Sequence, residues 1–164
     1  MKNENDVVDL LKNTERIGVD MWICGGWGVD ALMGRQTRPH NDIDIFIQKN
    51  DTAVFTEMLS LNGYHETKME CTTEDNPVWC DACNRIIDIH FFEFAEAGTL
   101  RFENELYPAN ILNGKGTIGG ITMRCLTAEA QIKYHQGYEQ KEKDRHDVLL
   151  LCQTFGFSIP EEYK

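Results

Sequence analysis

The sequence predicts an α/β or α+β domain in which helices flank a mixed β-sheet. Residue patterns follow the order helix, strand, helix, strand, helix, several strands and two helices. The hydrophobic fraction of 41% is too high for a disordered chain, and no repeat, low-complexity stretch or linker divides the 164 residues. We therefore expect one domain over 1–164, with the sheet over about 18–94 and a helical part over about 127–160.

Five elements are expected in the first 63 residues. Apolar residues at helical spacing, followed by a glycine, predict helices, and short runs rich in β-branched residues predict strands. Asp51 is expected to cap the third helix. The expected elements are a helix over 4–16, a strand over 20–24, a Gly25-Gly26 turn, a helix over 27–33, a strand over 43–47 and a helix over 52–62.

The second half of the chain supplies further strands and two helices. Segment 85–94 (RIIDIHFFEF) has the clearest strand pattern, whereas 95–120 is rich in Gly and Asn and is expected to be partly a long loop. Thr127 is expected to cap a helix that runs to about Tyr138. The remaining expected elements are strands over 64–69, 77–81 and 121–125 and a last helix over 143–155.

The charge balance restricts the partners of the protein. Asp and Glu number 27 against 16 Lys and Arg, for a net charge of −11. Such a surface repels nucleic-acid phosphates and disfavours a polymerase or a tRNA-modifying enzyme. It suits a cationic or neutral small molecule better, and any nucleotide site must gather its few basic residues locally.

The distribution of apolar residues predicts where the protein is located and, from that, whether its cysteines are oxidised. No window approaches 18 consecutive apolar residues, and the start of the chain lacks the apolar core of a signal peptide, so we expect no membrane partner and a cytoplasmic location. The six cysteines should then stay as thiols. Cys80 and Cys83 form one Cys-x-x-Cys pair, but Cys71, His65 and His90 do not add standard zinc spacing.

Two acids alternate in the apolar strand His40-Asn41-Asp42-Ile43-Asp44-Ile45-Phe46. Side chains alternate between the faces of a strand, so Asp42 and Asp44 point the same way. Two adjacent carboxylates repel each other, and a divalent cation removes that penalty. An all-oxygen ligand pair favours Mg²⁺ or Mn²⁺ over Zn²⁺. Two strand-end aspartates facing solvent or an arginine are the simpler alternative.

Two further segments strengthen this prediction. Gly25 and Gly26 lie between a strand and a helix, where glycine lets the backbone approach a phosphate and the helix offers N–H groups; an ordinary tight turn is the alternative. No Walker loop and no Rossmann fingerprint is present. Asp88 sits inside an apolar strand, and if that strand pairs with the Asp42 strand, three acids converge as phosphoryl transfer requires.

This combination resembles the nucleotidyltransferase superfamily that includes DNA polymerase β. The run GGWGVDALMGRQTRPHNDIDIF is similar to the small antibiotic nucleotidyltransferases, with their GGW, short helix and Arg-x-His-x-Asp-x-Asp strand. The whole length resembles the short lincosamide nucleotidyltransferases, whereas the aminoglycoside 2″-nucleotidyltransferases share mainly the front half. The resemblance implies a nucleotidyltransferase fold and a magnesium- or manganese-dependent enzyme with a nucleoside triphosphate as co-substrate.

The resemblance also implies roles for individual residues. Asp42 and Asp44 would bind the metal, and Asp88 would complete the acid set as third ligand or as general base. Another group would contact the nucleotide: Gly25, Gly26, Trp27, Arg38, His40, Lys143 and Arg145. His90, Phe92 and Tyr134 would contact the acceptor substrate. Asp147, one turn beyond Lys143, would hold that lysine in place, although an exposed salt-bridged helix face explains the same pattern.

The expected reaction is transfer of a nucleoside monophosphate from ATP or GTP to a hydroxyl of a lincosamide such as lincomycin or clindamycin, which would give antibiotic resistance. An aminoglycoside acceptor and a protein acceptor are the alternatives, and the acidic surface fits polycationic aminoglycosides well. Similar enzymes often form dimers, and the segment FFEF would supply apolar contacts for a homodimer.

Overall fold

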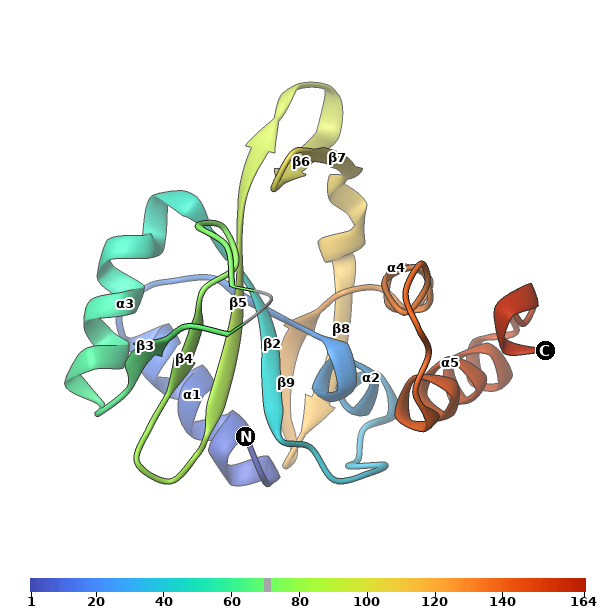
Figure 1. Cartoon of the computed structure of the whole chain (residues 1–164), viewed down its shortest axis with the longest axis horizontal. Coiled ribbons are helices and arrows are strands. Elements are labelled where there is room, and N and C mark those ends of the chain that lie inside the picture. The colour runs from blue at the N-terminus through green and yellow to red at the C-terminus, as the bar shows by residue number, and fades with distance from the viewer. Residues whose placement is uncertain (70–71) are drawn as a thin grey trace.

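The computed structural model describes residues 1–69 and 72–164. A mixed sheet of nine strands forms its centre, and helices flank it (Figure 1). In the first half the elements are α1 (Glu4–Arg16), β1 (Met21–Cys24), α2 (Gly25–Met33), β2 (Asp42–Gln48), α3 (Thr52–Leu61) and β3 (His65–Thr67). In the second half they are β4 (Val78–Cys80), β5 (Ile86–Ala95), β6 (Thr99–Phe102), β7 (Glu105–Pro108), β8 (Gly114–Ile118), β9 (Ile121–Cys125), α4 (Ala128–Tyr134) and α5 (Glu142–Phe155). The expected mixed sheet with flanking helices is thus confirmed.

The strand order explains why distant segments meet. The main path of the sheet runs β3-β4-β5-β2-β1-β9-β8, while β6 and β7 extend from the far end of β5. Strand β2 is parallel to β5 and antiparallel to β1, so it occupies the middle of the sheet. This central position places the Asp-x-Asp strand between the glycine-bearing β1–α2 turn and the strand that carries Asp88.

The two faces of the sheet bury different side chains. One face carries Ile43, Ile45 and Ile47 of β2 and packs with α1, α2 and α3 in the largest hydrophobic cluster. The other face carries Phe46 in a smaller cluster with residues of β1, β5, β6 and α4. Because side chains alternate along β2, Asp42 and Asp44 share this second face.

Several sequence-based boundaries need correction. Segment 95–120, expected to be partly a long loop, contains the strands β6, β7 and β8. These strands have four or five residues each, and they are stabilised by pairing with β5, with one another and with β9 rather than by a local pattern. Helix α2 begins at Gly25 rather than after the glycines, α4 ends at Tyr134, and Asp51 makes no capping bond to α3. Thr127 caps α4 as expected.

The structure describes five of the six cysteines, and their state as thiols in the cell stays a prediction. Five cysteines are free, and Cys71 lies outside the described residues. Among the described side chains, no group of three or more His, Cys, Asp or Glu residues is arranged to hold a metal ion. This finding also covers the surroundings of the Cys80–Cys83 pair. None of the described helices is both long and apolar enough to cross a membrane.

Candidate active site

A cavity of about 220 Å³ lies where the second face of the sheet meets the helical part of the chain. Its walls come from β1, α2, β2, β5, β6, α4 and α5. It therefore gathers residues from position 24 to position 144. Eight residues that we predicted for the active site from the sequence line it: Gly25, Gly26, Arg38, Asp42, Asp44, His90, Tyr134 and Lys143.

The acidic pair lies in the wall of this cavity. Asp42 and Asp44 are both half-buried, two positions apart on β2. Burial, followed by the charges of Asp42 and Asp88, raises the pKa of Asp44 to about 8. The carboxylates therefore lack a neutralising partner of sufficient charge. Their all-oxygen donor set fits a bound Mg²⁺ or Mn²⁺, which would favour the ionised form of both.

The glycine turn lies directly against the acidic pair. Gly25 opens α2 with a φ of +57°, and a Cβ atom at this position would collide with the carboxylate of Asp44. Cys24, the N-cap of α2, provides no side-chain capping bond. The N–H groups of the first turn and the positive end of the helix dipole therefore face the region beside Asp44, where they suit phosphate oxygens.

The third acid lies on the neighbouring strand. Asp88 is paired in register with Asp44 across the parallel strands β5 and β2. Asn76 donates hydrogen bonds to Oδ1 of Asp88 and to the carbonyl oxygen of Ile89, the latter at 3.1 Å. Burial raises the pKa of Asp88 to about 6, although the Asn76 bond opposes that rise. The cavity wall does not include Asp88. It thus adjoins the acidic pair as a separately held carboxyl group.

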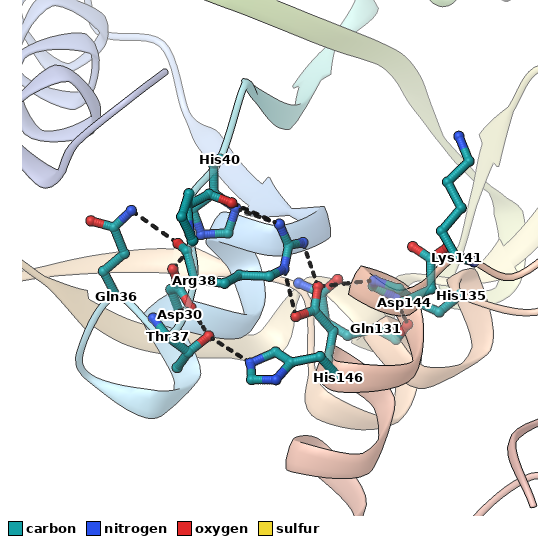
Figure 2. A network of polar contacts seen from close by, with 12 residues as sticks. Asp30, Gln36, Thr37, Arg38, His40, Gln131, His135, Lys141, Asp144 and His146 are labelled. Carbon is teal, nitrogen blue, oxygen red and sulfur yellow. Dashed lines mark hydrogen bonds and ion pairs between the residues drawn. The ribbon is translucent and has the colours of Figure 1, made fainter.

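A network of polar contacts supports the cavity from the side of α4 and α5 (Figure 2). Arg38 donates from Nε to Asp147 Oδ1 at 2.9 Å and from Nη2 to Asp147 Oδ2 at 2.6 Å. Its Nη1 donates to His40 Nδ1 at 3.0 Å. His40 must then carry its proton on Nε2, which donates to Asp30 Oδ2 at 2.5 Å.

This network changes the roles expected for several residues. The protein itself uses four of the five N–H groups of Arg38, including one to the carbonyl of Pro39, so at most one remains for a phosphate. His40 is buried, does not line the cavity and stacks on Trp27 at 4.4 Å between ring centroids. Trp27 is also buried. Both residues fit a structural role beneath the turn rather than the nucleotide contact that we expected.

Of the two expected nucleotide contacts on α5, Lys143 and Arg145, one lines the cavity and the other does not. Lys143 lines the cavity. Arg145 points elsewhere and donates from Nη1 to the carbonyl oxygen of Tyr163 at 2.7 Å, which anchors the end of the chain. The expectation that Asp147 holds Lys143 is wrong, since Asp147 pairs with Arg38 and lies 3.6 Å from Nε2 of His135.

Aromatic residues form the wall that continues from the acidic pair. The ring of His90 lies 5.0 Å from Phe46 and 5.2 Å from Phe102, centroid to centroid, and all three line the cavity. Burial lowers the pKa of His90 to about 4, so its ring is neutral at pH 7. Tyr134 lines the cavity as expected. Phe92 is fully buried in the core and does not reach it, a correction to the expected substrate contact.

Sequence reasoning missed part of the cavity wall. The missed lining residues are Cys24, Phe46, Phe102, Leu126, Gln131, His135 and Asp144. Phe46 could have been predicted from the sequence, because alternate residues of a strand share a face and Phe46 follows Asp42 and Asp44 on the same face of β2. The others carry no local signal, since they reach the cavity only through the packing of β6, α4 and α5 against the sheet.

Comparison with known proteins shows the family of the chain. The family described as aminoglycoside-2''-adenylyltransferase matches residues 6–151, which include every residue of the cavity wall. The chain belongs to this family. It is a nucleotidyltransferase, as its relatives are named.

Individual relatives refine the comparison. A lincosamide resistance protein of Staphylococcus haemolyticus is 28% identical over 92% of this chain and 98% of its own length. A 2''-aminoglycoside nucleotidyltransferase of Escherichia coli is 36% identical, but over 30% of each chain. The lincomycin-bound crystal structure of the lincosamide antibiotic adenylyltransferase LnuA superposes with a TM-score of 0.79 at 26% identity, covering 91% of this chain and 96% of that one. The complex of ANT(2'')-Ia with adenylyl-2''-tobramycin gives a TM-score of 0.77 at 21% identity, covering 93% and 89%, which shows a shared fold.

Proposed function

We propose that this chain transfers a nucleoside monophosphate from ATP or GTP to a hydroxyl group of a lincosamide, lincomycin or clindamycin, and thereby inactivates the antibiotic. The observation that carries the proposal is the cavity in which the acid pair Asp42 and Asp44 adjoins a wall of aromatic rings. Such a wall suits an acceptor with a large apolar surface and a single amine. The match to the lincosamide resistance protein along nearly its whole length supports the same acceptor class.

An aminoglycoside acceptor is the second candidate. The matching family and the net charge of −11 both favour it, because aminoglycosides are polycationic. The named aminoglycoside enzyme of Escherichia coli, however, matches only 30% of this chain. The aromatic wall also offers few carboxylates for several ammonium groups. For these two reasons we propose the lincosamide as the first acceptor class to test.

The residues divide into nucleotide and metal contacts. Asp42 and Asp44 would hold Mg²⁺, which when bound stabilises the charge on the phosphate oxygens. The first turn of α2, at Gly25 and Gly26, donates N–H groups to the triphosphate. Lys143 supplies a mobile positive charge at the opposite wall for the leaving pyrophosphate.

Activation of the acceptor hydroxyl is assigned to Asp88. A general base works best when its pKa is close to the working pH, and burial raises the pKa of Asp88 to about 6. Asn76 fixes the orientation of its carboxyl group. The hydroxyl oxygen attacks the α-phosphorus, the P–O bond to pyrophosphate breaks, and the hydroxyl proton passes to Asp88. Direct ligation of the metal by Asp88 is the alternative role, although no three acids among the described residues are arranged to hold a metal ion.

A transfer assay read by mass spectrometry tests the proposal. The protein is incubated with Mg²⁺ and either ATP or GTP, together with lincomycin, clindamycin or kanamycin in separate reactions. We expect an adduct of one nucleoside monophosphate on the first two drugs, which also identifies the donor. An adduct on kanamycin alone would show that the acceptor is an aminoglycoside rather than a lincosamide. Nucleotide binding without an adduct on any drug would point to another acceptor, such as a protein.

We also propose a homodimer. Phe94, in the segment FFEF of β5, is 54% exposed, and Leu106 on the neighbouring β7 hairpin is 59% exposed. Large apolar side chains at the end of an extended hairpin are suited to contact between subunits. Sedimentation of the wild type and of Phe94→Ser tests this, and a wild-type monomer at micromolar concentration would contradict it.

A further inference from the structure

Gln131 of α4 is a buried amide without a hydrogen-bond partner. It is fully buried, and neither Nε2 nor Oε1 of its carboxamide bonds to any group of the protein. Buried polar groups are almost always paired, because an unpaired one loses its hydration without compensation. Gln131 also lines the cavity of the candidate active site. The cavity is thus the place where its missing partner can bind.

The unpaired atoms of the protein concentrate at this cavity. Among the described residues, six buried side-chain atoms have no hydrogen-bond partner. Four of them belong to lining residues, namely both carboxamide atoms of Gln131, the hydroxyl of Tyr134 and Nδ1 of His90. A wall with this many unpaired groups is built for a ligand that supplies polar partners.

The position of Gln131 relates it to the nucleotide rather than to the acceptor wall. A Cβ atom at Gly28 would collide with Nε2 of Gln131, so the carboxamide packs directly on α2. Gly28 follows Gly25 by three residues, about one helical turn. A Cβ atom at Gly25 would in turn collide with the carboxylate of Asp44. The carboxamide therefore lies one turn behind the expected triphosphate site, whereas the rings of Phe46, His90 and Phe102 belong to β2, β5 and β6.

The chemistry of the carboxamide selects the ligand group. Its nitrogen donates and its oxygen accepts, and both are unpaired. Phosphate oxygens only accept, so a phosphate would leave Oε1 facing a negative charge. A ribose hydroxyl both donates and accepts, and the ribose is the part of the nucleotide next to the α-phosphate. We infer that the carboxamide of Gln131 hydrogen-bonds a ribose hydroxyl of the bound nucleoside triphosphate. This inference rests on the proposed nucleotide site.

Calorimetric binding in Mg²⁺ without any acceptor tests the inference. The wild type and Gln131→Met are titrated with the tighter-binding of ATP and GTP and with its 2′-deoxy and 3′-deoxy forms. We expect the wild type to bind one deoxy form about tenfold more weakly than the parent nucleotide. Gln131→Met should lose about tenfold on the parent and nothing further on that deoxy form. Gln153→Met, at an exposed glutamine of α5, is the matched control and should bind as the wild type.

Thermal unfolding of the ligand-free proteins separates this role from a structural one. Because methionine removes an unpaired buried amide, Gln131→Met should melt at the same temperature as the wild type or higher. Weaker binding with a lowered melting temperature would overturn the inference. The inference would also be overturned if the wild type bound both deoxy forms as tightly as the parent nucleotide. It would likewise be overturned if the Gln131→Met substitution and the missing hydroxyl each weakened binding by its full factor when combined. A wild type that binds no nucleotide would overturn the proposed function together with it, whereas a failure to modify lincomycin leaves this test intact.

Discussion

Arg38 and Asp147 stand 109 positions apart in the sequence and form a two-pronged ion pair that joins the loop before β2 to α5. The Asp147 carboxylate is fully buried, and the Arg38 side chain is 16% exposed. The pair therefore holds the helical part of the chain against the strand that carries Asp42 and Asp44. Its loss affects both stability and the shape of the cavity.

Asp147→Asn should lower the free energy of unfolding by about 2–3 kcal/mol, because it leaves the largely buried guanidinium of Arg38 without a counter-charge. Urea denaturation measures this difference. Asp20→Asn is the matched control, since it breaks the Arg124–Asp20 pair, in which both side chains are about half exposed. That control should cost less than about 1 kcal/mol. Equal losses of unfolding free energy in the two variants would show that the Arg38–Asp147 pair stabilises the protein no more than an exposed ion pair does.

The stability of the protein should depend on pH through His135 and Asp147. Burial would lower the pKa of His135, but Asp147, the carbonyl oxygen of Gln131 and the charge of Asp144 together outweigh it and raise that pKa overall. Burial would raise the pKa of Asp147, but Arg38 and His135 lower it overall. The contribution of His135 is complete below its unfolded pKa of about 6.5 and is lost as pH rises through its raised value. The contribution of Asp147 is lost as pH falls through its lowered value.

Urea denaturation from pH 4 to pH 9 checks this dependence. We expect His135→Gln to remove part of the decline in unfolding free energy on the alkaline side. The exposed His65 provides the control, and His65→Gln should leave the profile unchanged. An alkaline decline of the same size in His135→Gln and the wild type would contradict the assignment.

Gly25→Ala should abolish most of the turnover, because the added methyl group meets the carboxylate of Asp44. Gly34→Ala is the matched control, since Gly34 also has a positive φ but nothing lies within 4 Å of its added Cβ. Both variants should lose about 1–2 kcal/mol of stability from the left-handed backbone. Only Gly25→Ala should lose about a hundredfold in turnover, which the transfer assay measures. A similar loss in both would trace the defect to the backbone alone.

Asp44→Asn and Asp88→Asn should fail in different ways. Asp44→Asn should weaken Mg²⁺-dependent nucleotide binding, because it removes one carboxylate of the Asp42–Asp44 pair in the cavity wall. Asp88→Asn should retain binding and lose about 10²–10⁴-fold in kcat, as expected for a general base. Calorimetry and single-turnover kinetics distinguish the two, and Asp9→Asn on the exposed side of α1 serves as control. Loss of metal-dependent binding in Asp88→Asn would make Asp88 a ligand instead.

Phe102→Ala should raise the KM for lincomycin about tenfold and leave the KM for the nucleotide unchanged. The ring of Phe102 lines the cavity beside His90, and its removal takes apolar contact area from the acceptor. Phe155→Ala, at a phenylalanine of α5 that is 44% exposed, is the control. A rise in the KM for the nucleotide instead would indicate that Phe102 contacts the nucleotide rather than the acceptor.

Within the sequence, local rules determined the parts of the site that depend on local geometry. The alternation of side chains along a strand placed Asp42 and Asp44 on one face and the isoleucines on the other, and the structure has them there. The cap at Thr127 and the helix over 4–16 also follow from neighbouring residues. These predictions hold because the forces that produce them act between residues a few positions apart.

Only the tertiary structure decided what each of these residues touches. His90 and Phe92 share a face of β5, as parity requires, yet His90 lines the cavity while β6 pairs with β5 at Phe92 and helps bury it. Arg38 turned from an expected phosphate ligand into the partner of Asp147, and Gln131 reached the cavity through α4. Contacts of this kind join segments up to 109 positions apart, and no periodicity in the sequence encodes which segments pack together.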